Sequence, residues 1–395
     1  MGVRIGVFFG GKTVEHEVSI ISGIQAINSF SGDYDITPVY ITREGDMYSG
    51  PDMARVEEYR DVKALLAKSQ RVICVNNGGR FLLQKYPGKF WGNPVYKEID
   101  VAFPIVHGTN VEDGALQGFF KTLSIPFVGP DVAASAVGMD KYFMKTILKD
   151  NGIPVLDCRR VFVKSYFRET DKIISGIEAA YKYPMIVKPL NLGSSIGIKK
   201  AFDSAGLREA FEYAFQYTNI ALVEEAVSNL KEINCAVLGD LENAEASECE
   251  EPINTDLILS YEDKYISGDK SGSKGMSGAK RKLPADISPE LREEVRELAV
   301  RTFQALDCNG VSRIDFLMDT VSEQVWVNEI NTIPGSLSFY LWEPLGLSYS
   351  KLLERLVELA LKRERENADI SYSFETNILA NYTGSGAKGL KGGKH

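Results

Sequence analysis

The segment SRIDFLMDTVSEQVWVNEINTIPGS, residues 312–336, places charged and amide side chains on two apolar runs that a polar turn separates. The two runs predict the strands of a hairpin, in which successive side chains point to opposite faces. Arg313 and Asp315 therefore share one face of the first strand, and Glu329 and Asn331 share one face of the second. With a suitable pairing register, all four side chains converge on one patch of sheet.

This patch has the chemistry of a metal and substrate site. Mg²⁺ binds oxygen ligands, typically a few carboxylates together with substrate phosphates, and Asp315, Glu329 and Asn331 offer such oxygens. The alternative is a solvated hairpin face with ordinary salt bridges. Arg313 beside the acids, and Gly335 in the turn TIPGS, where backbone N–H groups can approach a substrate oxygen, favour the metal site. The opposite faces carry side chains that can pack: Ile314, Phe316, Val327 and Ile330.

A second polar segment, KPLNLGSSIG at residues 188–197, follows the apolar run YPMIV and predicts an anion-binding loop. Lys188 closes a strand, and Ser194 and Ser195 can surround a phosphate with N–H and hydroxyl donors. Lys141 opens a predicted helix upstream of this loop. Together with a magnesium patch, the two lysines become candidate ligands of ATP.

Residues 6–13, GVFFGGKT, match the Walker phosphate-loop pattern G-x-x-x-x-G-K-[ST]. In a Walker loop the residues between the glycines leave the strand, but here VFF continues the apolar strand. We therefore expect Gly6 to lie inside the strand and the turn to begin at Gly10. Glu15 falls in the first turn of the next helix, where it complements the helix dipole or holds a ligand amine.

The composition narrows the class of protein. The chain has 395 residues, 44% of them hydrophobic and 25% charged, as in soluble proteins of two or three domains. A net charge of −9 argues against nucleic acid or an acidic membrane surface as the main partner. The five cysteines form no CxxC pair, and the chain starts on a strand pattern rather than a signal peptide, so we expect a cytoplasmic protein.

Strands that alternate with helices predict an α/β and α+β protein with an open parallel sheet at its N-terminal end. We expect a Rossmann-like domain at residues 1–135, a small central α+β domain at 136–227 and a larger C-terminal α+β domain at 228–375. A disordered basic tail is expected at 376–395. The polar segment GDKSGSKGMSGAKRK, residues 268–282, predicts a surface loop or a mobile lid over an active site.

The chain resembles the D-alanine–D-alanine ligase family, within the ATP-grasp enzymes, from Val3 to about Lys362. The resemblance rests on segments that stand in the family's order: GGKTVEHEVSIISG, HGTNVEDGALQG, FVGPDVAASAVGMDK, KPLNLGSSIG, YEDKY, SRIDF and NEINTIPGS. It implies the ATP-grasp architecture and an ATP-dependent ligase that makes peptidoglycan precursor. ATP would phosphorylate the carboxylate of one D-alanine, and the amine of a second would attack the acyl phosphate.

The resemblance also implies roles for single residues. Substrate contacts and catalytic groups would come from Glu15 (on the first ammonium), His107, Arg313, the Gly335 N–H and either Ser336 or Ser338. Ser194 and Tyr265 would join Glu15 in a hydrogen-bonded set. ATP would be bound by Lys141, Lys188, Ser195, Glu224, Glu225, Glu232 and Lys264. Asp315, Glu329 and Asn331 would hold two Mg²⁺ ions, for which Mn²⁺ can substitute. A homodimer with small-molecule substrates is expected, without nucleic acid or membrane partners.

Three departures from the family pattern bear on this expectation. Val111 stands where the family commonly has glycine, SLSF follows NTIPG where Met-Thr is more frequent, and one extra residue precedes Glu232. Ligases that make D-alanyl-D-lactate carry a lid histidine, whereas this chain has no histidine between residues 108 and 394 and supplies Tyr265. An amine acceptor is therefore favoured, and the sequence does not decide between D-alanine and D-serine.

Other functions stay open at this point. The chain could be an ATP-grasp dipeptide ligase with different amino acids, or a binding module that lost activity through Val111. A Walker-type nucleotide switch would instead use Lys12 and Thr13.

Overall fold

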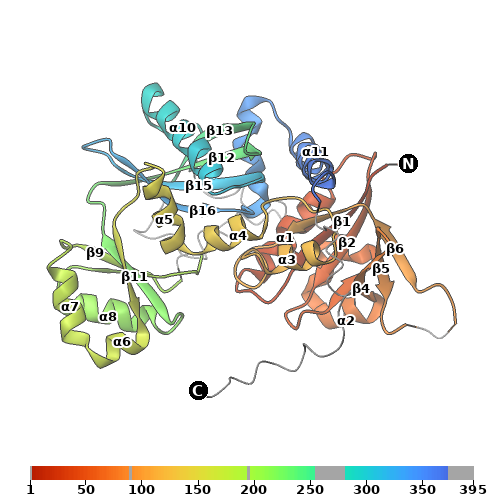
Figure 1. Cartoon of the computed structure of the whole chain (residues 1–395), viewed down its shortest axis with the longest axis horizontal. Helices are drawn as coiled ribbons and strands as arrows, with labels where there is room; N and C mark the ends of the chain where they lie inside the picture. The colour runs from red at the N-terminus through yellow and green to blue at the C-terminus, as the bar shows by residue number, and fades with distance from the viewer. Residues whose placement is uncertain (1, 89–90, 194–195, 254–280, 372–395) are drawn as a thin grey trace, which may run out of the picture.

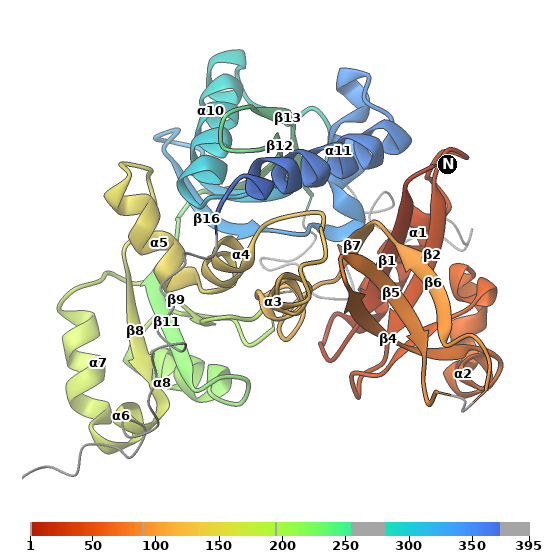
Figure 2. The ribbon, with the colours of Figure 1, turned by 45° about the vertical axis from the view of Figure 1, so that its right-hand side comes forward.

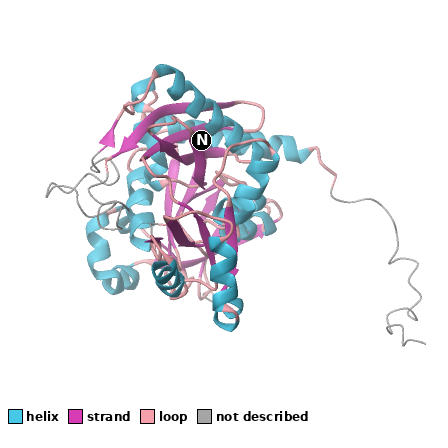
Figure 3. Cartoon of the chain, turned by 90° about the vertical axis from the view of Figure 1, so that its left-hand side faces the viewer, coloured by secondary structure: helices cyan, strands magenta, loops and turns pink. Residues whose placement is uncertain are grey.

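The computed structural model describes residues 2–88, 91–193, 196–253 and 281–371. Three sheets of seven, four and five strands form three lobes (Figure 1). The seven-stranded sheet is called sheet A, the four-stranded sheet is sheet C and the five-stranded sheet is sheet B. Helices flank the strands of the lobes (Figure 3), and within the described ranges no helix is long and apolar enough to cross a membrane.

Sheet A has the strand order β6-β5-β4-β3-β2-β1-β7. Its strands are β1 Arg4–Gly10, β2 Asp35–Ile41, β3 Met47–Ser49, β4 Gln70–Asn77, β5 Arg80–Lys85, β6 Val95–Ile99 and β7 Val101–Ile105. The helical segments of this lobe are α1 His16–Ile27, η1 Pro51–Ala54, η2 Val56–Asp61, α2 Val62–Lys68 and α3 Ala115–Thr122.

The expected parallel sheet is only partly correct. Pairing is parallel among β2, β1 and β7, but β3, β4, β5 and β6 pair antiparallel. The reason is local: Gly78 and Gly79, both with positive φ, connect β4 to β5 by a two-residue turn, which can join only antiparallel strands. Strand β4 is mostly half-buried, whereas β7 is fully buried.

The N-terminal strand confirms that the Walker match is accidental. Gly6 lies inside β1, and Phe8 and Phe9 are completely buried. The backbone turns at Gly10 and Gly11, whose φ angles of 95° and 99° favour glycine.

Sheet C has the order β10-β9-β11-β8 and is antiparallel throughout. Its elements are β8 Cys158–Phe162, α6 Val163–Arg168, α7 Thr170–Glu178, β9 Met185–Pro189, β10 Lys199–Ala201, α8 Ser204–Ala214 and β11 Ile220–Glu225. Met185 and Val187 of β9 and Ala221 and Val223 of β11 form a core with these helices. Because strand side chains alternate, Lys188 and Glu224 lie on the opposite face of the sheet.

Sheet B has the order β14-β13-β12-β15-β16. Its elements are β12 Leu230–Gly239, β13 Ala244–Pro252, β14 Arg281–Lys282, α10 Pro289–Ala305, β15 Gly310–Asp319 and β16 Val325–Asn331, and α4 Val132–Met139 and α5 Lys141–Asp150 lie beside it. The Ser288 side chain caps α10 by accepting from the Leu291 N–H. As expected, the apolar hairpin residues are buried: Ile314, Phe316, Val327 and Ile330. Met144 and Leu148 of α5, from the predicted central domain, belong to this same core.

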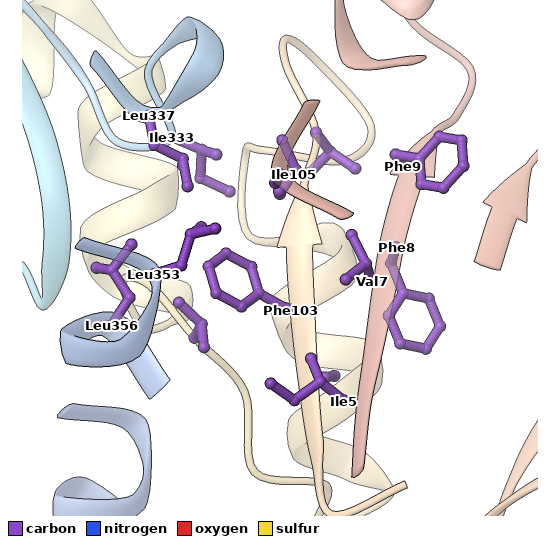
Figure 4. Close-up of a cluster of buried hydrophobic side chains, with 14 of the residues drawn as sticks. Ile5, Val7, Phe8, Phe9, Phe103, Ile105, Ile333, Leu337, Leu353 and Leu356 are labelled. Atoms are coloured by element: carbon purple, nitrogen blue, oxygen red, sulfur yellow. The ribbon is translucent and has the colours of Figure 1, made fainter. Parts of the chain in front are cut away.

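The last elements join sheets A and B. They are η4 Gly335–Leu341, η5 Glu343–Leu345 and α11 Tyr349–Ala368, which extends from the lobe of sheet B toward that of sheet A (Figure 2). Leu353 and Leu356 of α11 share one buried cluster with Phe103 of β7 and Leu337 of η4 (Figure 4). This cluster fixes the turn after β16 against the end of sheet A.

Neighbouring phenylalanines of α3 test the packing of sheet A. Phe120 is completely buried with its ring 4.8 Å from that of Phe8, whereas Phe119 is 36% exposed. We expect Phe120→Ala to lower the free energy of unfolding by about 3–5 kcal/mol, and Phe119→Ala by about 1 kcal/mol or less. Urea unfolding measures both variants. Equal losses would show that this core is assigned wrongly.

Candidate active site

The acidic hairpin face is assembled by strand pairing. Asp315 pairs with Glu329, and Arg313 pairs with Asn331, so the four side chains share one face of sheet B. Arg313 donates two hydrogen bonds to the Asp315 carboxylate, from Nε to Oδ1 at 2.6 Å and from Nη2 to Oδ2 at 2.8 Å. Asn331 Nδ2 donates to Asp315 Oδ2 at 3.1 Å. Burial lowers the pKa of Arg313, but the Asp315 charge outweighs burial and raises it above its ordinary value.

A bulge in β16 brings a further residue to this patch. The pairing shifts between Asp315 and Phe316, whose partners are Glu329 and Val327, so Asn328 is the extra residue. Asn328 Oδ1 accepts a hydrogen bond from Lys188 Nζ at 3.1 Å. The sequence did not indicate Asn328, because a bulge has no periodic signature.

Two lysines, one on α5 and one on β9 of sheet C, reach the same strand. Lys141 Nζ lies 3.2 Å from Glu329 Oε2 and donates to the carbonyl oxygen of Leu192, in the predicted anion loop, at 2.9 Å. Lys188 binds Glu224 Oε1 at 2.5 Å in addition to Asn328. The lysines, the loop and the acidic patch, which are distant in sequence, therefore form one site.

Glu15 lies where loops of sheet A and sheet C meet. A Cβ atom built on Gly193 would lie 3.5 Å from Glu15 Oε2, and one on Gly108 would lie 2.9 Å from the same oxygen. The turn after β1, the turn after β7 and the anion loop thus converge on this carboxylate. Glycine at position 108 is needed for this approach, because its φ is 84° and a side chain would meet Thr13.

A hydrogen-bonded chain fixes the turn after β16. The neutral His107 ring donates from Nδ1 to the Ile333 carbonyl at 2.9 Å, so Nε2 accepts from the Ser22 hydroxyl at 3.1 Å. Ser22 Oγ accepts in turn from the Ser336 N–H at 3.1 Å. Burial lowers the pKa of His107, which keeps the ring neutral at neutral pH. Sequence reasoning missed Ser22, which stands two helical turns after Glu15.

The residues that follow Gly335 have unusual backbone geometry. Ser336, Leu337 and Ser338 have φ angles of 49°, 54° and 48°, in the left-handed region that is unfavourable for residues with a side chain. Such strain persists only where the surroundings hold it, and it concentrates at functional sites. Ser22 binds the first of these residues, and Leu337 is buried between the sheets.

Glu112 is a buried carboxylate that the sequence did not single out. Its Oε2 accepts from the Gly108 N–H at 2.9 Å, and its Oε1 accepts from the Ile333 N–H at 2.9 Å and from Thr332 Oγ1 at 3.2 Å. Burial raises its pKa to about 7 despite these donors. Glu112 therefore joins the turn after β7 to the turn after β16.

The neighbour of Glu112 takes no strained conformation. The positive φ in this turn, 68°, belongs to Asn110, and asparagine tolerates it. Val111 does not have a positive φ. The Val111 side chain is instead buried, and a Cβ on Gly11 would lie 2.4 Å from it.

A polar cluster on β13 borders Arg313 and was also missed. Glu250 pairs with Asn234, which pairs with Asp315, so a polar row crosses the sheet. Glu250 Oε1 accepts from Tyr340 Oη at 2.9 Å and from Asn234 Nδ2 at 3.0 Å. This row fixes η4 from the side opposite Ser22.

The remaining predicted residues are not all brought together. Glu224 is buried beside Lys188, but Glu225, the next strand residue, points to the opposite face and accepts from the Lys182 N–H at 2.7 Å. Glu232 lies on β12, on the face that carries Asp315. The other predicted residues lie outside the described ranges: Ser194, Ser195, Lys264 and Tyr265. Most of the predicted lid segment, residues 268–280, lies outside them too.

The acidic patch suits a hard metal ion. Among the described residues no three His, Cys, Asp or Glu side chains gather as a metal site. Asp315 and Glu329 offer carboxylate oxygens on paired strands, and Asn331 adds an amide oxygen. A few such ligands completed by substrate phosphates fit Mg²⁺.

Comparison with known proteins gives one family. The family models "D-ala D-ala ligase N-terminus" and "D-ala D-ala ligase C-terminus" match residues 4–130 and 147–358. The chain is 38% identical to a D-alanine–D-alanine ligase of Acetivibrio thermocellus over 381 residues. This match covers 92% of this chain and 97% of the relative. It is 36% identical to that of Thermosipho melanesiensis, which covers 95% of this chain and 98% of the relative.

Solved structures agree with this similarity. The D-alanine–D-alanine ligase from Coxiella burnetii superposes with a TM-score of 0.76 at 29% identity, covering 93% of this chain and 96% of that one. The VanG D-Ala:D-Ser ligase from Enterococcus faecalis superposes with a TM-score of 0.74 at 31% identity, covering 91% of this chain and 100% of that one.

The raised pKa of Glu112 predicts a pH-dependent stability. The unfolded carboxyl loses its proton near 4.5, whereas the folded one keeps it to about 7. Its contribution to stability is therefore fully present below pH 4.5 and is lost as the pH rises through about 7. Relative to Glu112→Gln, which cannot ionise, we expect the wild type to lose on the order of 3 kcal/mol across this window. Urea unfolding at several pH values measures the difference, and parallel stability curves would contradict it.

Proposed function

The chain belongs to the D-alanine–D-alanine ligase family, and we propose that the residues gathered between its three sheets carry out the reaction. The protein is an ATP-dependent carboxylate–amine ligase with the ATP-grasp architecture, and it joins two D-alanines for peptidoglycan precursor synthesis. A carboxylate oxygen of the first D-alanine takes the γ-phosphoryl group of ATP, and ADP leaves. The amine of the second attacks the carbonyl carbon, and phosphate leaves.

The observation that carries the residue assignment is the double contact of two lysines. Lys141 reaches both the anion loop and Glu329, and Lys188 reaches both Glu224 and Asn328. Their ammonium groups, one from α5 and one from β9, bind the phosphates of ATP. The acidic patch of sheet B faces the same phosphates. Ser195, Lys264, Glu225 and Glu232 remain proposed as further nucleotide contacts, and Glu224 as one near the adenine.

Substrate binding is proposed for the loops that end sheet A. The Glu15 carboxylate holds the ammonium of the first D-alanine, and Ser194 and Tyr265 are its proposed partners. His107 acts through the turn after β16, because its contacts are to Ile333 and Ser22. That turn aims the Gly335 N–H at the developing oxyanion, where Arg313 adds a positive charge. Ser336 or Ser338 contacts the substrate carboxylate.

Asp315, Glu329 and Asn331 are the proposed ligands of two Mg²⁺ ions, or of Mn²⁺. Bound there, the metal would neutralise phosphate charge during transfer. Within the chain, Arg313 and Lys141 already pair with two of these acids, so the patch is held in place by cations before nucleotide binds.

Other features rest on the family resemblance and on the composition of the chain. We propose a homodimer in the cytoplasm, with no nucleic-acid or membrane partner. D-serine remains the alternative second substrate, since the VanG enzyme to which the chain is similar is a D-Ala:D-Ser ligase.

An assay of product mass tests the activity. With ATP, Mg²⁺ and D-alanine we expect phosphate release and a D-alanine dimer, because one pocket activates the carboxylate and the other holds the amine. A mixed D-alanyl-D-serine product formed in preference to the dimer would select the alternative acceptor. Phosphate release that needs neither amino acid would contradict both.

Two lysine variants test the nucleotide site. Lys188→Ala removes a buried ammonium at the proposed phosphates, and we expect ATP affinity to fall by about tenfold or more, equivalent to about 1.4 kcal/mol. Lys12→Ala, in the accidental Walker match, serves as the control and should leave it unchanged. Isothermal titration calorimetry without D-alanine measures both. If Lys12→Ala weakened ATP binding and Lys188→Ala did not, the nucleotide would bind at the GGKT turn instead.

A further inference from the structure

Glu224 holds two lysines at once in the interior of the protein. Its Oε1 accepts from Lys188 Nζ and its Oε2 accepts from Lys145 Nζ, both at 2.5 Å. The side chains of Lys145, Glu224 and Lys188 are 3%, 2% and 5% exposed. The three residues come from α5, β11 and β9, so the cluster connects a helix of the sheet B core to sheet C.

The second lysine is more than local charge balance requires. Burial raises the pKa of Glu224, but the two ammonium groups outweigh burial and lower it to about 2. One carboxylate thus has two cationic partners. Each lysine also has a second acceptor: Lys188 donates to Asn328 Oδ1 at 3.1 Å, and Lys145 donates to the Leu156 carbonyl at 3.3 Å.

Nucleotide binding would change the ion pairs of this cluster. If Lys188 turns toward phosphate oxygens, Glu224 loses one of its two partners. A buried carboxylate left without any counter-charge is strongly destabilising. With Lys145 in place, the carboxylate keeps one ion pair, and Lys188 can leave it at a smaller cost.

The helix that supplies Lys145 also supplies Lys141. The two residues are four positions apart in α5 and therefore lie on one face of the helix. Lys141 points to the anion loop and Glu329, and Lys145 points to Glu224. One helix face thus carries both a phosphate-side lysine and the lysine that remains with the carboxylate.

We propose that Lys145 is a positioning residue that keeps Glu224 paired, so that Lys188 is free to bind the phosphates of ATP. This inference rests on the proposed function, in which Lys188 contacts phosphate. Lys145 itself touches neither substrate nor nucleotide phosphate in this account.

Lys145→Met tests the proposal through nucleotide affinity rather than turnover. Calorimetric titration with ATP and Mg²⁺, without D-alanine, should show binding weakened at least tenfold, because ATP must then compete with Glu224 for Lys188. Lys149→Met is the matched control: Lys149 stands four residues later on α5, where it pairs with Asp157 at the surface. It should bind ATP as the wild type does. Unchanged affinity in Lys145→Met would overturn the proposal.

A second background separates this role from general loss of structure. In Glu224→Gln no carboxylate competes for Lys188, so adding Lys145→Met should change ATP affinity less than threefold. A tenfold loss of ATP affinity in that background too would contradict the proposal. This outcome can be measured even if Lys145→Met alone fails to fold.

If Lys188→Ala leaves ATP binding intact, the proposed role of Lys188 fails. If Lys188→Ala weakens binding but Lys145→Met does not, the inference about Lys145 alone fails.

Discussion

The site depends on buried ammonium groups that connect two separately formed sheets. Lys188 of sheet C reaches Asn328 of β16. Lys141 of α5, beside sheet B, reaches Glu329 of β16 and the Leu192 carbonyl in the loop after β9. Charged groups are rarely buried unless they are paired, so these contacts hold the two lobes at a defined distance. This pairing sets the space proposed for the nucleotide, since Glu224 and the acidic hairpin supply the opposing charges.

A second constraint acts on the turn after β16. Three consecutive left-handed residues would be costly in isolation, and hydrogen bonds from sheet A and from β13 compensate. Ser22 and Glu112 approach from the sheet A side, and Glu250 holds Tyr340 from the other. These contacts position the Gly335 N–H, as its proposed role in stabilising an oxyanion requires.

Much of the hairpin could be predicted from the sequence, because alternation within a strand determines which side chains share a face. The apolar face, the cap of α10 and the accidental Walker match were likewise readable from local pattern. Contacts between distant segments were not. Lys145 resembles any helical lysine until Glu224, 79 residues away, is placed against it. The antiparallel half of sheet A was missed because apolar runs do not report which neighbour they pair with.

The central claim is that sheets B and C hold one triphosphate between them. A crystal structure with a non-hydrolysable ATP analogue and Mg²⁺ tests it most directly. The account predicts phosphate oxygens within about 3 Å of the ammonium groups of Lys141 and Lys188, with the metal ions on Asp315 and Glu329. Phosphates bound beside Lys12 at the turn after β1, with the two lysines still paired to their carboxylates, would contradict it.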